Sequence, residues 1–475
     1  MDRKWRTLII VCVAIFMLLL DITIVNVALP RIQTDLHTSF TDLQWVVDAY
    51  SLMLATVMLT AGSLGDLLGR KRVFLSGVAL FTIASALCGA ATTPLFLNLA
   101  RGAQGIGGAI MFAVSLALLS QEFHGRERGT AFGIWGATIG AAVAIGPLAG
   151  GVLTEGLGWR WIFFVNIPIG VALVFFGMRV LVESRDETHG GIDVPGLVTL
   201  SVGLFALVLG LLRGNDWGWS SGRVVGLFAA AVVFIVAFTL IELREAHPMF
   251  DPRLFRVPAF AGAQITAFAI SSAMFAQFLF LTLYLQNVLG LSPIQTGVRF
   301  LPLSVVSFFV APLAGRLSST IPIRVLLGVG LALNGVALLL MHGVTSSSNW
   351  TTLLAGFIVA GIGIGMVNPP LATTAVSVVP PRQAGMAAGA NNTFRQVGIA
   401  TGIAGLGALF QHSIATRVPP NLVHATSSGL AEHGAFIHGL NEIFLVGAIV
   451  AFAGAALAFA LVRKRDFVAS APAQA

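Results

Sequence analysis

The sequence is divided into a long series of apolar runs, each about long enough to cross a bilayer. A membrane-spanning helix needs roughly 20 mainly apolar residues, and a scan at that length predicts about fourteen spans. The composition agrees, because 56% of the 475 residues are hydrophobic, 10% are charged and the mean hydropathy is +0.90. A soluble globular domain carries about 25% charged residues. The chain is therefore predicted to be an all-α polytopic membrane protein.

The apolar runs are arranged as six, two and six. The first six start near residues 8, 43, 73, 95, 129 and 161, two more cover 194–213 and 222–242, and six start near 259, 294, 322, 350, 384 and 436. This arrangement predicts a six-helix half at 1–185, two inserted helices with cytoplasmic loops at 186–257, and a second six-helix half at 258–475. Transporters are commonly built from such repeats.

Basic residues in the loops predict the orientation. With the N-terminus inside, about 19 Lys and Arg lie on cytoplasmic segments and about 5 outside, so both termini are expected in the cytoplasm. The N-terminal MDRKWR and the apolar run after it resemble a signal peptide, but no convincing cleavage site follows, which favours a retained first span. The polar stretch 413–435 contains Pro and Gly and is predicted to be the longest extracytoplasmic loop.

Several functional classes find no support in the sequence. The chain has 27 basic and 20 acidic residues, but they are spread over short loops, so nucleic acid is not an expected partner. Cys12 and Cys88 lie inside apolar runs, and neither a disulfide framework nor a Cys–His metal site is predicted. No phosphate-binding loop or H-E-x-x-H pattern is present, so we expect no cofactor, no metal and no ATP hydrolysis.

Three ionisable residues interrupt the apolar runs of the first half. A charge at the centre of a membrane helix costs roughly 2.5–3.5 kcal/mol, so such residues are usually functional or specifically paired. At a rise of 1.5 Å per residue, Asp21 lies roughly 13 Å from the outer end of its span, Arg101 roughly 9 Å and Asp48 roughly 8 Å. These similar depths favour a facing cluster over a permanent Asp–Arg pair that only fixes helix packing.

Small residues follow one face of the fifth predicted span. They recur at intervals of three or four and comprise Gly133, Gly136, Gly140, Ala144, Pro147 and Gly151. Such a stripe predicts close packing with another helix, and a proline within a span permits a kink. Ordinary tight packing explains the stripe alone, whereas the stripe together with Pro147 favours a hinge.

The segment after the second span, GSLGDLLGRKRV at 62–73, resembles a signature of the major facilitator superfamily, G-x-L-a-D-r-x-G-r-k-x-x. Its matching residues are Gly62, Leu64, Asp66, Gly69, Arg70 and Lys71, and Leu67 replaces a basic residue. Topology alone can explain a basic triplet at a cytoplasmic turn, but the complete spacing is more specific. The resemblance implies a conformational gate formed by Gly62, Gly65, Asp66, Gly69, Arg70 and Lys71.

Other stretches narrow the resemblance. RGAQGIGGAI, with Arg101, Gln104 and Gly105, is similar to a second family signature, and IGPLAGG, with Gly146, Pro147, Gly150 and Gly151, is similar to the antiporter motif G-P-x-x-G-G. Together with LDITIVNVALP, WVVDAYSL and WRWIFFVNIPIG, they resemble fourteen-span drug/proton antiporters of the QacA and EmrB type. This resemblance implies the major facilitator fold and alternating access in a bacterial inner membrane, with multidrug efflux and antibiotic resistance as the physiological outcome.

The second half shows weaker traces of the same plan. PLAGRLSSTIPIR at 312–324 occupies the place of the gate signature but has Gly315 where an acid is expected. In NNTFRQVGIATGIAGLG, the residues Asn391, Arg395, Gly398, Gly402 and Gly405 share one helix face. We regard Asp48, Gln104, Asn391, Arg395 and Glu442 as candidates for lining the substrate cavity. Interfacial snorkelling is an equal explanation for Glu442.

The leading functional hypothesis is proton-coupled export of drugs or other organic, amphipathic or cationic compounds, with Asp21, Arg101 and Asp48 coupling the proton. Its expected partners are protons, a small organic molecule and membrane lipid, and a monomer is the working expectation. One alternative is a transporter of the same family that moves a lipid or endogenous metabolite. A polytopic membrane enzyme is less favoured, because no convincing set of acid, base and nucleophile is present.

Overall fold

The computed structural model describes residues 2–38, 40–185, 193–245, 248–275, 277–345, 347–380, 383–416 and 429–467. This part of the chain forms helices and contains no strand. The helices of the first part are α1 (Arg3–Leu36), α2 (Phe40–Leu68), α3 (Arg70–Gly89), α4 (Pro94–Glu122), α5 (Gly125–Gly156), α6 (Trp161–Phe164), α7 (Asn166–Val180), α8 (Val194–Trp217) and α9 (Gly222–Glu242). The remaining helices are α10 (Pro258–Ile270), α11 (Gln277–Leu283), α12 (Pro293–Leu317), α13 (Ile323–Met341), α14 (Leu354–Ser377), α15 (Ala384–Ala415) and α16 (Gly429–Leu461).

The number of membrane spans agrees with the sequence. Within the described residues, 12 segments are long and apolar enough to cross a membrane, with α6 and α7 counted as one and α10 with α11 as another. Helices α5 and α15 fall outside this set, but each has 32 residues and packs among the others. The chain is therefore a multi-pass protein of twelve to fourteen spans. The predicted all-α class is confirmed.

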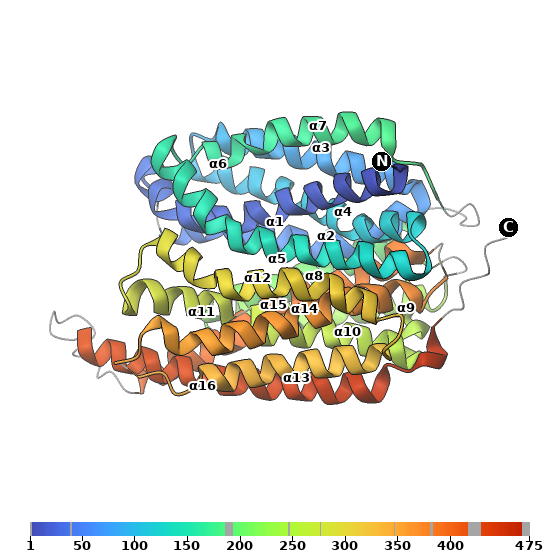
Figure 1. The fold of residues 1–475 in the computed structure, drawn as a ribbon. Coiled ribbons are helices and arrows are strands. Elements are labelled where there is room, and N and C mark those ends of the chain that lie inside the picture. The colour runs from blue at the N-terminus through green and yellow to red at the C-terminus, as the bar shows by residue number, and fades with distance from the viewer. Residues whose placement is uncertain are drawn as a thin grey trace.

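The helices lie side by side in one bundle (Figure 1). Helices α1–α7 occupy one side and α12–α16 the other, while α5 and α12 lie against each other where the two sides meet. Helix α1 begins and α16 ends at the same end of the bundle. The inserted helices α8 and α9 pack against each other, and α8 also contacts α2 and α15. The domain boundaries at 185 and 257 stay a prediction.

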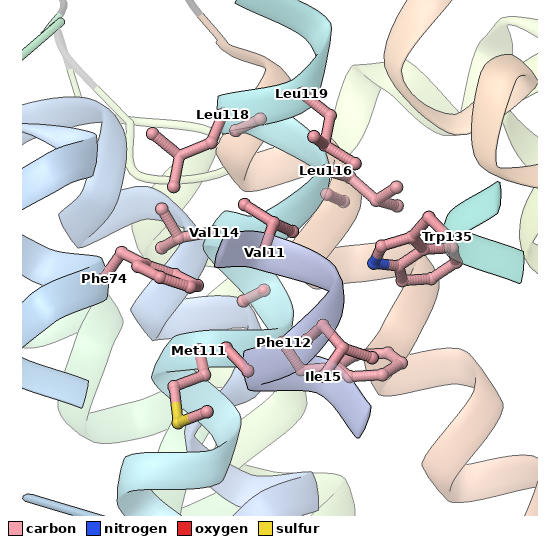
Figure 2. Packing of buried hydrophobic residues seen from close by; sticks show 14 of the residues in the cluster. Val11, Ile15, Phe74, Met111, Phe112, Val114, Leu116, Leu118, Leu119 and Trp135 are labelled. Carbon is pink, nitrogen blue, oxygen red and sulfur yellow. The ribbon is translucent and has the colours of Figure 1, made fainter. Parts of the chain in front are cut away.

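Each side has its own apolar core. The largest cluster of the first side draws on α1, α3, α4 and α5, and Figure 2 shows Val11, Phe74, Phe112 and Trp135 converging from these helices. A second large cluster joins α10–α14 with α16. The first cluster also includes Ala372 of α14 and side chains of α15, so apolar packing continues between the two sides. Burial of such side chains contributes roughly 25 cal/mol per Å² relative to water, although the lipid-facing reference is itself apolar.

Two local features differ from the sequence expectation. The predicted loop at 413–435 is wrong at both ends, because α15 continues to Ala415 and α16 already begins at Gly429; the part at 417–428 lies outside the described residues. Leu430, Ala431 and Glu432 are good helix formers, which explains the extended helix. The stretch from Pro258 to Val288 contains two π-helical segments, Ser271–Phe275 and Tyr284–Val288, which hydropathy does not reveal.

Candidate functional site

A buried carboxylate forms the centre of a polar cluster in the first half. Asp21 of α1 and Arg101 of α4 are each about 1% exposed, and Arg101 Nη1 donates to Asp21 Oδ2 at 2.5 Å. The other carboxylate oxygen, Oδ1, accepts from Gln104 Nε2 at 2.9 Å and from Asn166 Nδ2 at 3.1 Å. The structure therefore brings together three helices, α1, α4 and α7, around one acid.

The local sequence explains this convergence. Arg101 and Gln104 are three residues apart, so they share a face of α4. Asn166 is the first residue of α7 and follows the short helix α6, which ends at Phe164. Its amide also donates to Ser85 Oγ at 3.0 Å, and that hydroxyl in turn donates to Phe163 O at 2.9 Å. The amide is therefore held in place from α3 as well.

The cation of the pair is equally well satisfied. Arg101 Nε donates to Val46 O at 3.0 Å, and Nη1 also contacts Gln104 Oε1 at 2.7 Å. The guanidinium carbon lies 4.2 Å from the centroid of the Tyr50 ring, a cation–π distance. Gly105 permits this approach, because a Cβ there would overlap Tyr50 O. Removing one partner of such a buried pair typically costs about 3–5 kcal/mol.

Asp48 does not join this cluster, which corrects the expectation that three charges face one another. Instead, Asp48 Oδ2 lies 3.0 Å from Arg213 Nη2 of the inserted helix α8. Arg213 is 1% exposed, contacts Asp216 Oδ2 at 3.1 Å and stacks on Trp45 with its guanidinium carbon 4.3 Å from the ring centroid. A similar depth in the membrane was not enough to predict a contact with Asp21 and Arg101, because the Asp48 side chain points to a different helix. Its expected roles in proton coupling and in lining the substrate cavity stay predictions.

The predicted gate joins α2 to the second half. Asp66 Oδ1 accepts from Arg70 Nη2 at 2.8 Å and from the backbone N–H of Gly385 at 3.1 Å, while Oδ2 accepts from the N–H of Met386 at 2.8 Å. Asp66 thus lies at the N-terminus of α15, where free N–H groups and the helix dipole favour a negative charge. Gly62 is required beside it, because a Cβ at this position would overlap Gly385 O.

The rest of the gate segment organises the start of α3. Gly69 has φ of 109°, a conformation that favours glycine, and a Cβ there would lie 2.6 Å from Glu183 Cδ. Glu183 accepts from the backbone N–H of Lys71 at 3.0 Å, and Lys71 Nζ donates to Met178 O at 2.7 Å. Gly65 faces α4, with a built Cβ 2.8 Å from Val114 Cγ2. The basic turn therefore has structural partners as well as topological charge.

The antiporter motif of α5 crosses α1 next to the buried acid. A Cβ on Gly146 would overlap Thr23 Oγ1, and a Cβ on Gly150 would lie 3.0 Å from Ile24 O. Gly151 instead faces the second half, where an added Cβ would lie 3.0 Å from Ile294 Cγ1 of α12. These close approaches place the motif one turn of α1 from Asp21. The side chains of Pro147 and Ala144 lie outside the described residues.

The second-half candidates separate into two places. Arg395 of α15 is buried, and its Nη2 donates to Asn368 Oδ1 of α14 at 2.6 Å. Asn391 faces α10, donating to Ala263 O and Gln264 Oε1 at 3.3 Å each. Glu442 contacts His438 at 3.2 Å on α16 and is 41% exposed. Across the described ranges, no ion pair joins Glu442 to Arg395.

Sequence reasoning missed three residues that complete these sites. Asn166 and Ser85 interrupt apolar runs, and this is the signal that could have identified Asn166 as a partner of Asp21. Arg213 ends the apolar run of the first inserted helix and could have been read as a buried cation, but only the fold identifies Asp48 as its partner. Among the described residues, no group of three or more His, Cys, Asp or Glu side chains is placed to hold a metal ion.

Two packed helical sides around buried charged groups are typical of membrane transporters. Comparison with known proteins identifies the family. Residues 11–403 match the model of the Major Facilitator Superfamily, and the chain belongs to this family. Its members are transporters, as the sequence predicted.

Curated relatives match along most of their length. The tetracenomycin C resistance and export protein of Streptomyces glaucescens is 35% identical over 96% of this chain and 91% of its own length. The puromycin resistance protein pur8 of Streptomyces alboniger is 37% identical over 98% and 92%, respectively. A crystal structure of the human organic anion transporter MFSD10 superposes with a TM-score of 0.64 over 95% of this chain and all of that chain, at 14% sequence identity. This last likeness supports the fold only.

Proposed function

We propose that the protein is a proton-coupled exporter of drugs or other organic compounds that works by alternating access. The relatives support the export role, because several that are 35–37% identical bear the names of resistance and export proteins. The observation that supports proton coupling is the environment of Asp21, whose carboxylate is hydrogen-bonded at both oxygens inside the membrane, next to the α1–α5 crossing. The expected substrate is a small organic molecule, and the coupling ion is a proton.

The chemistry follows from competition for Asp21. In this structure Arg101, Gln104 and Asn166 donate to the two oxygens of the carboxylate. A conformational change that separates α1 from α4 would remove these donors and leave the carboxylate open to a proton. Because α5 contacts α1 at Gly146 and α12 at Gly151, movement between the two sides would reach this acid directly. Proton release and the direction of opening are thereby linked.

The proposed location is the cytoplasmic membrane of a bacterium, with both termini in the cytoplasm. The excess of Lys and Arg in the loops on the N-terminal side supports this orientation. The Asp66 gate would then close the cytoplasmic end, which fits an outward-facing or occluded state. Green fluorescent protein fluoresces in the cytoplasm but does not fold after export through the general secretion route. A C-terminal fusion should therefore be fluorescent in intact cells, and a dark fusion would contradict this orientation.

The decisive experiment is export by purified protein in proteoliposomes under an imposed pH gradient, tested with a panel of fluorescent dyes and antibiotics. Asp21→Asn should still bind substrate, but gradient-driven export should fall at least about tenfold because no proton can be exchanged. Asp35→Asn is the matched control on the same helix, since Asp35 is 44% exposed in its contact with Arg160. Proton release on substrate addition, measured with a pH dye, should disappear only in Asp21→Asn.

Folding defects are separated from coupling defects by a double variant. Asp21→Asn alone leaves Arg101 buried without its counter-ion, which destabilises the protein. In the variant that combines Asp21→Asn with Arg101→Gln the buried charge is gone, so thermal stability should recover while coupled export stays lost. Wild-type export rates and proton release in this double variant would show that Asp21 serves packing alone.

A further inference from the structure

The second half contains a buried cation that lacks a counter-ion. Arg395 lies in the interior of α15 and is 7% exposed. Its described polar contact is with the neutral amide of Asn368, at 2.6 Å, and none of the ion pairs among the described residues includes it. An isolated charge in a low-dielectric interior costs several kcal/mol unless an opposite charge or several hydrogen bonds offset it. The guanidinium has five N–H donors, so much of its capacity is left over.

The sequence itself cannot supply the missing charge from the same half. Between residues 258 and 461 the chain contains only two acidic residues, Glu432 and Glu442. Glu442 is half exposed and lies beside His438, and the side chain of Glu432 lies outside the described residues in the first turn of α16. The contrast with Arg101 is direct, because that cation is held by Asp21 at 2.5 Å. The counter-charge of Arg395 must therefore come from elsewhere.

The position of Arg395 favours a ligand from the transport pathway. Its partner Asn368 faces the first half, since a Cβ on Gly136 of α5 would lie 3.6 Å from Asn368 Cβ. On α15 itself, Ala388 lies two turns before Arg395 and belongs to the apolar cluster of α1, α4 and α5. The cation thus lies where the second half faces the first. Groups at this junction are exposed in turn as the two halves move.

A second unsatisfied polar group lies on the same side of α15. Asn392 is three residues before Arg395 and is 1% exposed, yet neither its Oδ1 nor its Nδ2 has a hydrogen-bond partner. Buried polar atoms without partners are rare in native proteins and call for an explanation. A ligand oxygen would satisfy the amide N–H of Asn392 together with the free N–H groups of Arg395.

We propose that Arg395, assisted by Asn368 and Asn392, binds an acidic group, such as a carboxylate or phenolate, of the exported compound. A guanidinium matches such a group by two parallel hydrogen bonds, and the charge repels cations. The inference rests on the proposed export function and specifies its substrate class. The proposed substrates are therefore organic anions and not the cations expected from the sequence. A membrane potential that is negative inside the cell favours the exit of anions.

Two dyes with the same xanthene skeleton provide the test. Fluorescein carries acidic groups and rhodamine 123 is a cation, and their binding to purified protein in nanodiscs can be measured by fluorescence polarisation at pH 7.5. Wild type should prefer fluorescein, and Arg395→Gln should weaken fluorescein binding by about 10- to 100-fold without weakening rhodamine 123, the loss expected for a charged hydrogen bond. Arg395→Lys should retain part of the preference. Arg299→Gln, a change in another arginine of a second-half span, should leave it intact.

A variant of Asn368 tests the missing counter-ion without any ligand. Asn368→Asp places a carboxylate where Asn368 Oδ1 already contacts Arg395, so the melting temperature should rise by about 2 °C or more. The same change in an Arg395→Gln background should lower it, because the new acid is then buried alone. It should also abolish fluorescein binding by occupying the cation.

The outcomes separate this inference from the export proposal. Equal fluorescein binding by wild type and Arg395→Gln, or an unchanged or lower melting temperature in Asn368→Asp, would overturn the anion site. If rhodamine 123 were nevertheless exported under a pH gradient, the export function would stand. Conversely, anion binding that depends on Arg395 in a protein that transports no dye or antibiotic under any gradient would contradict export and leave the anion site in place.

Discussion

The two seams between the halves differ although both are built on glycine. In the first seam, α2 meets α15, with Gly62 against Gly385. In the second, α5 meets α12, and a Cβ on either Gly129 or Gly315 would overlap the carbonyl oxygen of the other. Both crossings bring backbones into direct contact. The first seam has an acid beside the crossing, because Asp66 accepts from two N–H groups of α15, whereas Gly315 occupies the corresponding place in the second half.

The seams also differ in extent. The α5–α12 contact runs from Gly129 to Gly151, which lies beside Ile294. Between them, a Cβ added to Gly140 would lie 3.7 Å from Ser307 Oγ. The α2–α15 contact is closest near the gate, at Gly62 and Gly385, and it continues at Gly389, where a Cβ would lie 2.8 Å from Met58 O. Towards the other end, α8 contacts both partners, through Arg213 to Asp48 and through Asn215 Nδ2 to Ala404 O at 3.2 Å.

This difference suggests separate mechanical roles. The α5–α12 seam is packed along its length, and no hydrogen bond or ion pair crosses it among the side chains that the structure describes. It therefore has no discrete contact to break and suits a pivot. A seam joined at one end by an ion pair and helix-end hydrogen bonds has two distinct arrangements, made or broken, so it suits a latch. We expect the α5–α12 seam to persist through the transport cycle and the α2–α15 seam to open at Asp66.

The largest effect is expected from Gly129→Leu in the full-length seam. The side chain would collide with Gly315 O, and since this seam persists in every state no conformation relieves the clash. We predict a loss of several degrees in melting temperature and export at least about 100-fold below wild type. Gly156→Leu on the same helix is the control, because a Cβ there meets no atom within 4 Å. A stable, active Gly129→Leu protein would refute the pivot.

Gly62→Leu should be less damaging to folding but nearly as damaging to transport. The clash with Gly385 prevents closure at the gate, yet the open state relieves it. We expect a near-normal melting temperature and export reduced by about 10- to 100-fold. A single cysteine introduced near the gate in a background without Cys12 and Cys88 should label faster than in the parent. Equal labelling rates would mean that this seam does not open.

Asp66→Asn should weaken the latch without steric change. The amide retains acceptor capacity but loses the charge that faces Arg70 and the α15 N-terminus, a loss worth about 1.5–3 kcal/mol. The open gate should gain about tenfold in population or more, with export reduced by a similar factor. Glu127→Gln is a suitable control, because Glu127 forms an exposed ion pair with Lys4 at the N-terminus of α5. If cysteine labelling showed wild-type populations, the charge at position 66 would serve topology alone.

Much of this arrangement could be predicted from the sequence, for identifiable reasons. Hydropathy located the spans because the bilayer fixes their length. Depth along a helix predicted a cluster of Asp21, Arg101 and Asp48, and the structure brings the first two together but not Asp48. The spacing around Asp66 indicated a gate by resemblance, and the structure adds its partners, the N–H groups of Gly385 and Met386.

The remaining features depend on positions that depth does not determine. Asp48 has a depth similar to that of Arg101 but faces outward to α8, and rotation about a helix axis cannot be read from a single uniformly apolar run. The glycine contacts of Gly315 likewise depend on which helix lies opposite. Similarly, the sequence shows that the second half has few acids to pair with Arg395. That Arg395 lies where the second half faces the first is known only from its contact with Asn368 in the structure.

The smallest effect is expected at the far end of the first seam, where Arg213 joins the inserted helix to Asp48. Arg213→Gln removes an ion pair whose acid is 21% exposed, while Gln44 and Asp216 can still bind the new amide. The stack on Trp45 is also lost, so we predict about a two- to fivefold change in export rate and little change in melting temperature. Because α8 contacts both α2 and α15 here, the change should alter labelling of a cysteine placed near Asn215 more than one near Asp66. Arg223→Gln is the matched control, since Arg223 is exposed at the start of α9. If Arg213→Gln abolished export while Asp66→Asn did not, the latch would lie at α8 and the comparison of the two seams would have to be reversed.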